Sequence, residues 1–201
     1  MGQYYKPLVL TKKKPVVTET ILAWMYSHEY DNGLKLMEHS WIGNNFVETF
    51  ESLLSPRGKY AKHRIVWAGD YADGEYELTT KDETGRDVET TLYSLCKDNT
   101  KINPKQVTKS KYRFILNHTT KEFVDKTKCV VTDVWTDPKT GKEHPFTIHP
   151  LPLLTCEGCF RGGGDFHDET NTFVGTWARH SISVANTVPK GFKEIVPDFK
   201  E

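Results

Sequence analysis

The sequence lacks an excess of charge of either sign. Its 201 residues contain 27 lysines and arginines against 27 aspartates and glutamates, so the formal net charge is zero. A protein that coats nucleic acid with uniform positive charge, or an acidic mimic of nucleic acid, would not balance in this way. The balance therefore excludes a surface that is uniformly of one sign.

Long hydrophobic runs are absent too. No segment approaches the ~20 consecutive apolar residues of a membrane span, and no apolar signal segment follows Met1. We therefore expect a cytoplasmic protein without a membrane partner. Hydrophobic residues make up 37% and aromatic residues 12% of the chain, which excludes a disordered tail. The length is that of one ordinary domain, so we expect a single domain over residues 1–201.

Cysteine is scarce, with four in the whole chain. In a chain expected to be cytoplasmic, four cysteines do not predict a disulfide framework. Cys96 and Cys129 stand alone in apolar segments and are expected in the core. Cys156 and Cys159 form a C-x-x-C pair, which together with His167 could hold structural zinc. Because a second pair of ligands at short spacing is missing, we expect no cofactor and keep structural zinc as the weaker alternative.

Motifs that specify common enzymes are missing. The chain contains no G-x-S-x-G, H-E-x-x-H or G-x-G-x-x-G. Its strand-like segments also lack the regular alternation with helices that builds a parallel nucleotide-binding sheet. Strands are expected near residues 4–11, 18–27, 63–68, 112–117, 129–135, 146–154 and 181–184, mostly joined by short turns such as Asp137–Gly141. The pattern predicts an α+β fold with a mostly antiparallel sheet.

One segment predicts a clear amphipathic helix. Apolar residues recur there at the spacing of one helix face, and Asn44 and Asn45 offer a cap before them. The apolar face consists of Phe46, Val47, Phe50, Leu53 and Leu54. Residues 88–96 predict a shorter helix, so we expect one or two short helices beside the amphipathic one.

A glycine-rich segment is the strongest candidate for binding an anion. Gly162, Gly163 and Gly164 free the backbone between Arg161 and Asp165, and successive N–H groups in such a turn can surround a phosphate or carboxylate. The arginine would add a positive charge. The alternative is a flexible loop between two strands, since no Lys-Ser or Lys-Thr follows as in a phosphate-binding P-loop.

Four residues are candidates for acid–base catalysis. Histidine titrates near neutral pH and can exchange a proton with a substrate when a carboxylate lies close. The candidates are His39, His118, Asp70 and Asp165. Each has a structural alternative, because a histidine is often hydrogen-bonded in a core and an aspartate often closes a turn. Asp70 and the neighbouring Tyr71 follow a predicted strand, where a carboxylate and a ring suit a sugar or a base.

Several phrases occur together along nearly the whole chain. They are MGQYY at 1–5, KLMEHSW at 35–41, WAGDYAD at 67–73 and RGGGD at 161–165. In these phrases the sequence resembles a family of uncharacterised bacterial and bacteriophage proteins of about this length. The resemblance implies a bacterial or phage protein that acts in the cytoplasm of a bacterial host. It implies no catalytic residues.

The leading hypothesis is a protein that binds a small anionic or nucleotide-like ligand and thereby interferes with a host process. The expected lining consists of Arg161, Gly162, Gly163, Gly164, Asp70, Tyr71, His39 and Trp177. A second hypothesis is a small hydrolase that uses the histidines and aspartates named above. A third is a protein that binds a host protein or forms part of a virion, with an exposed apolar patch and no ligand pocket.

The zero net charge hides two opposed blocks. Residues 69–98 contain nine acidic and three basic residues, a net charge of −6, whereas residues 101–128 contain eight basic and two acidic residues, a net charge of +6. We expect the two blocks to pair across the sheet. If they face apart, the 101–128 block becomes a surface for anions or nucleic acid.

Overall fold

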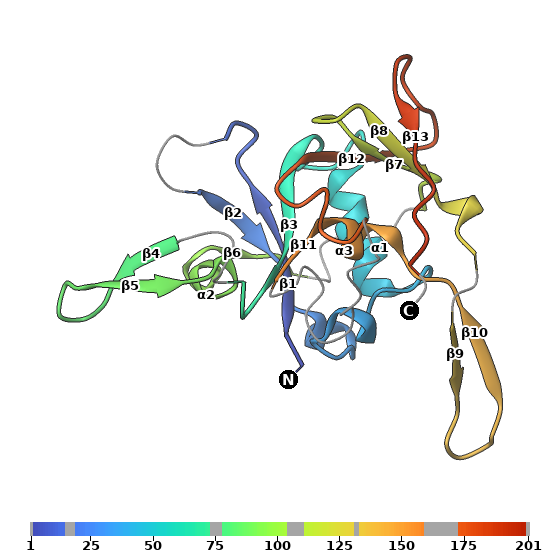
Figure 1. Ribbon diagram of the computed structural model, residues 1–201, viewed down its shortest axis with the longest axis horizontal. Coiled ribbons are helices and arrows are strands. Elements are labelled where there is room, and N and C mark those ends of the chain that lie inside the picture. The colour runs from blue at the N-terminus through green and yellow to red at the C-terminus, as the bar shows by residue number, and fades with distance from the viewer. Residues whose placement is uncertain are drawn as a thin grey trace.

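A nine-stranded sheet forms the centre of the protein, as the computed structural model shows over residues 2–14, 19–72, 78–103, 111–130, 133–158 and 173–199 (Figure 1). The strand order is β13-β8-β7-β12-β3-β1-β2-β6, and β11 pairs with β3 as well. The strands are β1 (Tyr5–Leu10), β2 (Ile21–Trp24), β3 (His63–Gly69), β6 (Thr100–Lys101), β7 (Phe114–Asn117), β8 (Glu122–Asp125), β11 (Cys156–Glu157), β12 (Ser181–Ala185) and β13 (Lys193–Glu194).

Helical segments are short. The α-helices are α1 (Asn45–Leu54), α2 (Leu92–Leu95) and α3 (Pro150–Thr155), and single 3₁₀ turns are η1 (Ser27–Tyr30), η2 (Leu36–Glu38), η3 (Cys96–Asp98) and η5 (Lys126–Lys128). In the part of the chain that the structure describes, no helix is long and apolar enough to cross a membrane.

The central strands β1 and β3 are covered on both faces. Val9 and Trp67 belong to the larger core cluster, which includes the apolar residues of α1 and α3. Leu8 and Val66 point to the other face and join a smaller cluster with Leu92 of α2. Because both faces are buried, these strands consist of continuous apolar runs rather than alternating apolar and polar residues.

The sheet is mixed, so the prediction of a mostly antiparallel sheet is wrong. Three pairings are parallel: β6 with β2, β11 with β3, and β13 with β8. Each parallel partner is a two-residue strand. Such a partner is too short to carry a periodic pattern, and the residue at which it returns to the sheet depends on tertiary packing. No local pattern in the sequence therefore predicts these parallel pairings.

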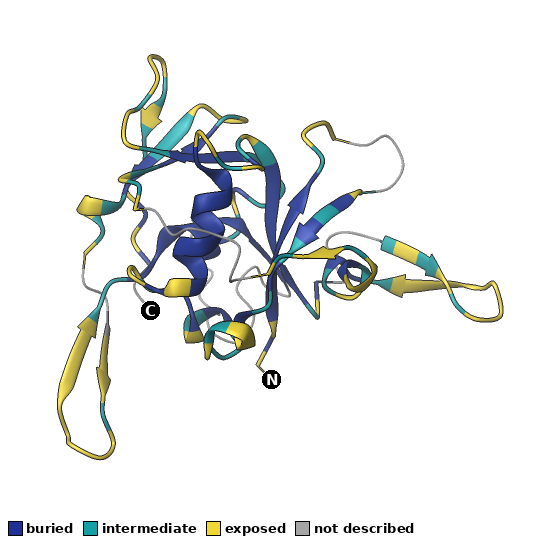
Figure 2. Ribbon diagram, turned by 180° about the vertical axis from the view of Figure 1, so that it is seen from behind, coloured by how far each residue is buried: buried dark blue, intermediate teal, exposed yellow. Residues whose placement is uncertain are grey.

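Helix α1 begins where the sequence predicts but is not amphipathic. The Asn44 side chain accepts hydrogen bonds from the backbone N–H groups of Phe46 and Val47, at 2.9 and 3.3 Å. Nine of its ten residues are buried, as the dark blue helix in Figure 2 shows. The expected polar face is covered because Glu51 receives two hydrogen bonds from Lys126, at 2.8 and 2.6 Å, and lies 3.3 Å from the ring of His149.

Two predicted elements have different bounds in the structure, each for a local physical reason. Residues 146–154 were expected to form one strand, but the strand ends at Phe146 and helix α3 begins at Pro150. Proline is favoured in the first helical turn, and His149 Nδ1 accepts the Leu151 N–H at 3.2 Å as the cap. The expected helix at 88–96 shrinks to α2, because Val88 lies in a hairpin strand.

Two hairpins stand away from this body (Figure 1). One pairs β4 (Leu78–Lys81) with β5 (Asp87–Thr90), and the other pairs β9 (Asp133–Thr136) with β10 (Glu143–Phe146). Each forms a separate two-stranded sheet. Figure 2 shows both hairpins largely in the colour of exposed residues, unlike the central sheet.

Candidate functional site

The β9–β10 hairpin, called the tryptophan hairpin below, is closed by a turn that its sequence specifies. The Asp137 carboxylate accepts hydrogen bonds from the Lys139 N–H at 2.8 Å and the Thr140 hydroxyl at 2.7 Å. Gly141 has φ +67°, a backbone conformation that glycine adopts without strain. Its N–H bonds the Asp137 carbonyl at 2.8 Å. The turn fixes the register in which the two strands meet.

Large apolar side chains of the tryptophan hairpin face solvent. Trp135 is 55% exposed and Val134 is 45% exposed. The two residues are paired across the ladder with His144 and Pro145, and the Trp135 and His144 ring centres lie 5.4 Å apart. Successive side chains of a strand point to opposite faces, so each face of this ribbon carries one of them. An isolated two-stranded ribbon is marginally stable in water, and tryptophan is enriched at the centres of protein–protein interfaces.

The two strands of the tryptophan hairpin differ in their backbone groups. In the described residues β9 pairs only with β10. On β10, Pro145 has no N–H and cannot donate to a further strand.

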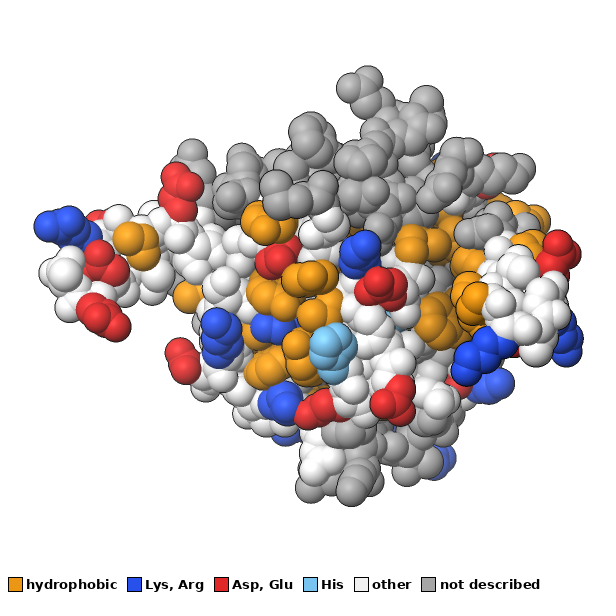
Figure 3. Space-filling model, turned by 90° about the horizontal axis from the view of Figure 1, so that it is seen from below, with side chains coloured by type: hydrophobic (Ala, Val, Ile, Leu, Met, Phe, Trp, Pro, Cys, Tyr) orange, Lys and Arg blue, Asp and Glu red, His pale blue; other side chains and the backbone are white. Residues whose placement is uncertain are grey.

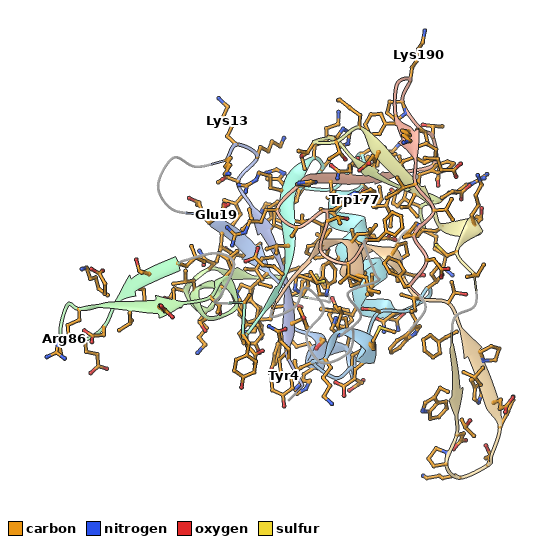
Figure 4. The ribbon with its side chains drawn as sticks, in the orientation of Figure 1. Tyr4, Lys13, Glu19, Arg86, Trp177 and Lys190 are labelled. Carbon is orange, nitrogen blue, oxygen red and sulfur yellow. The ribbon has the colours of Figure 1, made fainter. Side chains whose placement is uncertain are left out.

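The β4–β5 hairpin is similar in shape and different in surface. Lys81 and Asp87 form an exposed ion pair at 2.7 Å across it. Its turn is held by Asp82, whose carboxylate accepts from the Arg86 N–H at 2.9 Å. Figure 4 shows Arg86 at the far end of this hairpin. Val88, 38% exposed, is its one large hydrophobic side chain among the exposed residues. This hairpin thus offers an internal comparison for the other.

His39 lies fully buried beneath the sheet. Trp67 Nε1–H donates to its Nε2 at 3.0 Å, and its Nδ1 lies 3.2 Å from the Gly33 carbonyl. Since Nε2 accepts, Nδ1 carries the proton and the ring is neutral. Burial lowers the pKa of His39 from 6.5 to about 4. The ring therefore holds the core together, and both of its nitrogens are occupied.

The structure does not bring His118 and Asp70 together. The backbone N–H of His118 bonds Ser181, which is paired with the beginning of β3, whereas Asp70 follows the end of β3. Seven residues of extended chain separate these ends by roughly 20 Å. Asp70 accepts the Tyr4 N–H at 2.9 Å, and burial raises its pKa.

Two further residues of the expected ligand lining differ in exposure. Tyr71 is 48% exposed beside Asp70. Trp177 is buried, and its Nε1–H donates to Glu122 at 3.1 Å (Figure 4). With His39 also buried, the described part of the expected lining reaches the surface at Asp70 and Tyr71 alone.

The remaining candidates lie partly outside the described residues. Arg161, Gly162, Gly163, Gly164 and Asp165 fall there, as do Cys159 and His167. Cys156 is buried, and its thiol donates to the Leu153 carbonyl at 3.2 Å. Among the residues that the structure describes, no group of three or more His, Cys, Asp or Glu side chains could hold a metal ion.

Lys6 is a buried cation that sequence reasoning missed. Its ammonium lies 3.7 Å from the ring centre of Tyr93 and 5.0 Å from that of Trp24, and donates to the Tyr93 carbonyl at 3.3 Å. Burial lowers its pKa, while the ring faces attract the charged form. Tyr4, which Figure 4 labels near the lower edge of the molecule, is exposed, and Figure 3 shows hydrophobic side chains gathered on the face seen from below. The sequence signal for this buried cation was a lysine within the otherwise apolar strand β1.

The two charge blocks do not pair with each other in the described chain. The basic block forms ion pairs elsewhere: Lys101 with Glu29, Lys111 with Glu48, Arg113 with Asp125, Lys126 with Glu51 and Lys128 with Glu194. Among the described residues, none of these acidic partners comes from residues 69–98. The pairs neutralise most of the described block, so the block as a whole is not a continuous basic surface.

Trp135 was also missed as a site residue. The sequence predicts a strand at residues 129–135 before a strong turn, without distinguishing this strand from those of the central sheet. Pro145, which disfavours a central strand, was the signal against a place in the central sheet. No protein-family model, no curated protein and no solved structure matches this chain.

Proposed function

We propose that this protein binds a partner protein through the tryptophan hairpin, with Trp135 as the anchor. The observation that carries the proposal is the exposure of Trp135 and Val134 on a ribbon that stands away from the body. Tryptophan is enriched among the residues that contribute most to protein–protein binding. The turn at Asp137 preorganises the ribbon, which reduces the entropy lost on binding.

The geometry favours this function over the two other hypotheses. A ligand site would need its lining residues to converge at the surface, and His39 and Trp177 are buried. A hydrolase would need His118 close to an aspartate, and Asp70 lies at the opposite end of β3. The small-ligand and hydrolase hypotheses stay predictions. The resemblance to bacterial and phage proteins makes a protein of a bacterial host the expected partner.

The test replaces Trp135 with serine and compares capture of proteins from a bacterial lysate. We expect the wild-type chain to retain a defined protein that W135S retains at less than about a tenth of that amount, the loss of a hot-spot residue. A photo-crosslinking aromatic amino acid at position 135 should form an adduct with the same protein. Because Trp135 is exposed, W135S should fold normally.

Val88→Ser on the other hairpin is the matched control and should capture as the wild type does. Light scattering after size exclusion shows whether the captured partner is a second copy of the chain. A dimer that W135S abolishes would support binding by the hairpin. Equal capture by wild type and W135S, with no crosslink at 135, would overturn the proposal.

A further inference from the structure

Positive charge gathers where β7 turns into β8, at the beginning of β3. The Lys62 carbonyl accepts a hydrogen bond from the Ser181 hydroxyl at 2.8 Å. The Ser181 carbonyl in turn accepts a hydrogen bond from the His118 N–H at 2.8 Å. Burial lowers the pKa of His118, and the positive charges of Lys62 and Lys121 lower it further. Residues from three segments therefore meet at this corner.

The loop between β12 and β13 extends the same corner. The Phe192 ring centre lies 5.4 Å from that of His118 and 5.3 Å from the ammonium of Lys121. The Lys193 N–H bonds the Lys121 carbonyl at 2.8 Å. Lys190 projects from this loop away from the body (Figure 4). We call Lys62, Lys121, Lys190 and Lys193, with His118 and Phe192, the basic rim.

The lysines of the basic rim form no ion pair with any residue that the structure describes. The acidic residues that follow Lys121 and Lys193 in the sequence are engaged with other residues. Glu122 accepts hydrogen bonds from Thr120 at 2.6 Å and from Trp177 at 3.1 Å, and Glu194 pairs with Lys128 at 2.7 Å. The four lysines are exposed, so their charge is available to a ligand.

We propose that the basic rim binds the phosphate backbone of single-stranded nucleic acid. Its cations come from three separate segments, which suits a chain of regularly spaced phosphates better than a single phosphate. Phe192 is half-buried among them and offers a ring on which a base can stack. Lys121 and His118 belong to the 101–128 segment, and Lys62, Lys190 and Lys193 lie outside it, so the sequence block contained only part of this surface.

The test measures fluorescence anisotropy of a labelled twelve-nucleotide single strand, as DNA and as RNA. We expect K62Q/K121Q to weaken binding at least about tenfold and to lower the slope of log affinity against log salt by about 1.4, or ~0.7 per lost contact. Replacing these two lysines with glutamine adds no backbone strain, so the variant keeps the fold. K139Q/K142Q in the turn of the tryptophan hairpin removes the same charge elsewhere and should bind as the wild type does.

Two further measurements separate the alternatives. Phe192→Leu should weaken binding without changing the salt slope, since it removes stacking and no charge. A nucleoside triphosphate or inorganic phosphate should compete only at far higher concentration than unlabelled strand. Equal loss in the rim and hairpin variants, an unchanged affinity in K62Q/K121Q, or competition by free phosphate at the strand's own concentration would overturn the proposal. None of these outcomes depends on binding by the tryptophan hairpin.

Discussion

His39 connects three parts of the chain through one ring. It bonds Trp67 of β3 and the Gly33 carbonyl, and packs edge-on against Phe46 of α1 at 5.2 Å between ring centres. The ring can make both bonds only while it is neutral, because its protonated form has no acceptor nitrogen for the Trp67 N–H. The same contacts that stabilise the core thus make it sensitive to acid.

We predict that this histidine contributes to acid destabilisation. Its pKa is about 4 in the folded protein and 6.5 without the fold, so the unfolded state binds the proton first. Stability is complete above pH 6.5 and falls between pH 6.5 and 4, by at most about 3 kcal/mol from this group. H39Q should be less stable at pH 7 and show a shallower decline over that range in urea unfolding.

The wild type is the reference for that measurement. Burial also lowers the pKa of His118 to about 4, and His118 is present in both proteins, so their difference isolates His39. A slope in H39Q equal to that of the wild type would contradict the assignment. His28→Gln, which removes an exposed histidine, serves as the matched control for loss of a histidine outside the core.

Side chains that bond nearby backbone groups allowed the sequence to predict where helix α1 begins and where the tryptophan hairpin turns. Asn44 caps α1 and Asp137 closes the tryptophan hairpin, because in each case a side chain bonds backbone groups only two or three residues away. The sequence could not predict that Lys126 and His149 cover the polar side of α1. It could not predict the exposure of Trp135 either, since burial depends on packing between distant segments.

The cap of α1 should contribute measurably to stability. We predict that Asn44→Ala destabilises the protein by about 1–2 kcal/mol, because two backbone N–H groups at the buried helix start lose their acceptor. Asn44 also donates to Asn32 at 2.8 Å, which adds to the loss. Asn45→Ala removes an exposed asparagine one residue later and should change stability by less than about 0.5 kcal/mol. Equal effects in thermal unfolding would contradict the cap.

The tryptophan hairpin and the basic rim lie in different parts of the molecule. Lys190 of the rim projects beyond the β13 end of the sheet in Figure 4, and the hairpin projects in another direction in both Figures 1 and 2. The central strands β1 and β3 of the sheet are packed on both faces. Rigid elements of this kind hold two surfaces apart, so that one chain can join two partners.

This arrangement predicts that the two binding surfaces act independently. W135S should bind the labelled single strand with the affinity of the wild type, and K62Q/K121Q should still form the crosslink at position 135. In the variant that combines all three substitutions, the losses in binding free energy should add within about 0.5 kcal/mol, as for distant sites. A larger coupling would mean that the hairpin and the rim contact the same partner. Loss of strand binding in W135S alone would place the nucleic acid on the hairpin instead, because no described contact links Trp135 to the rim lysines.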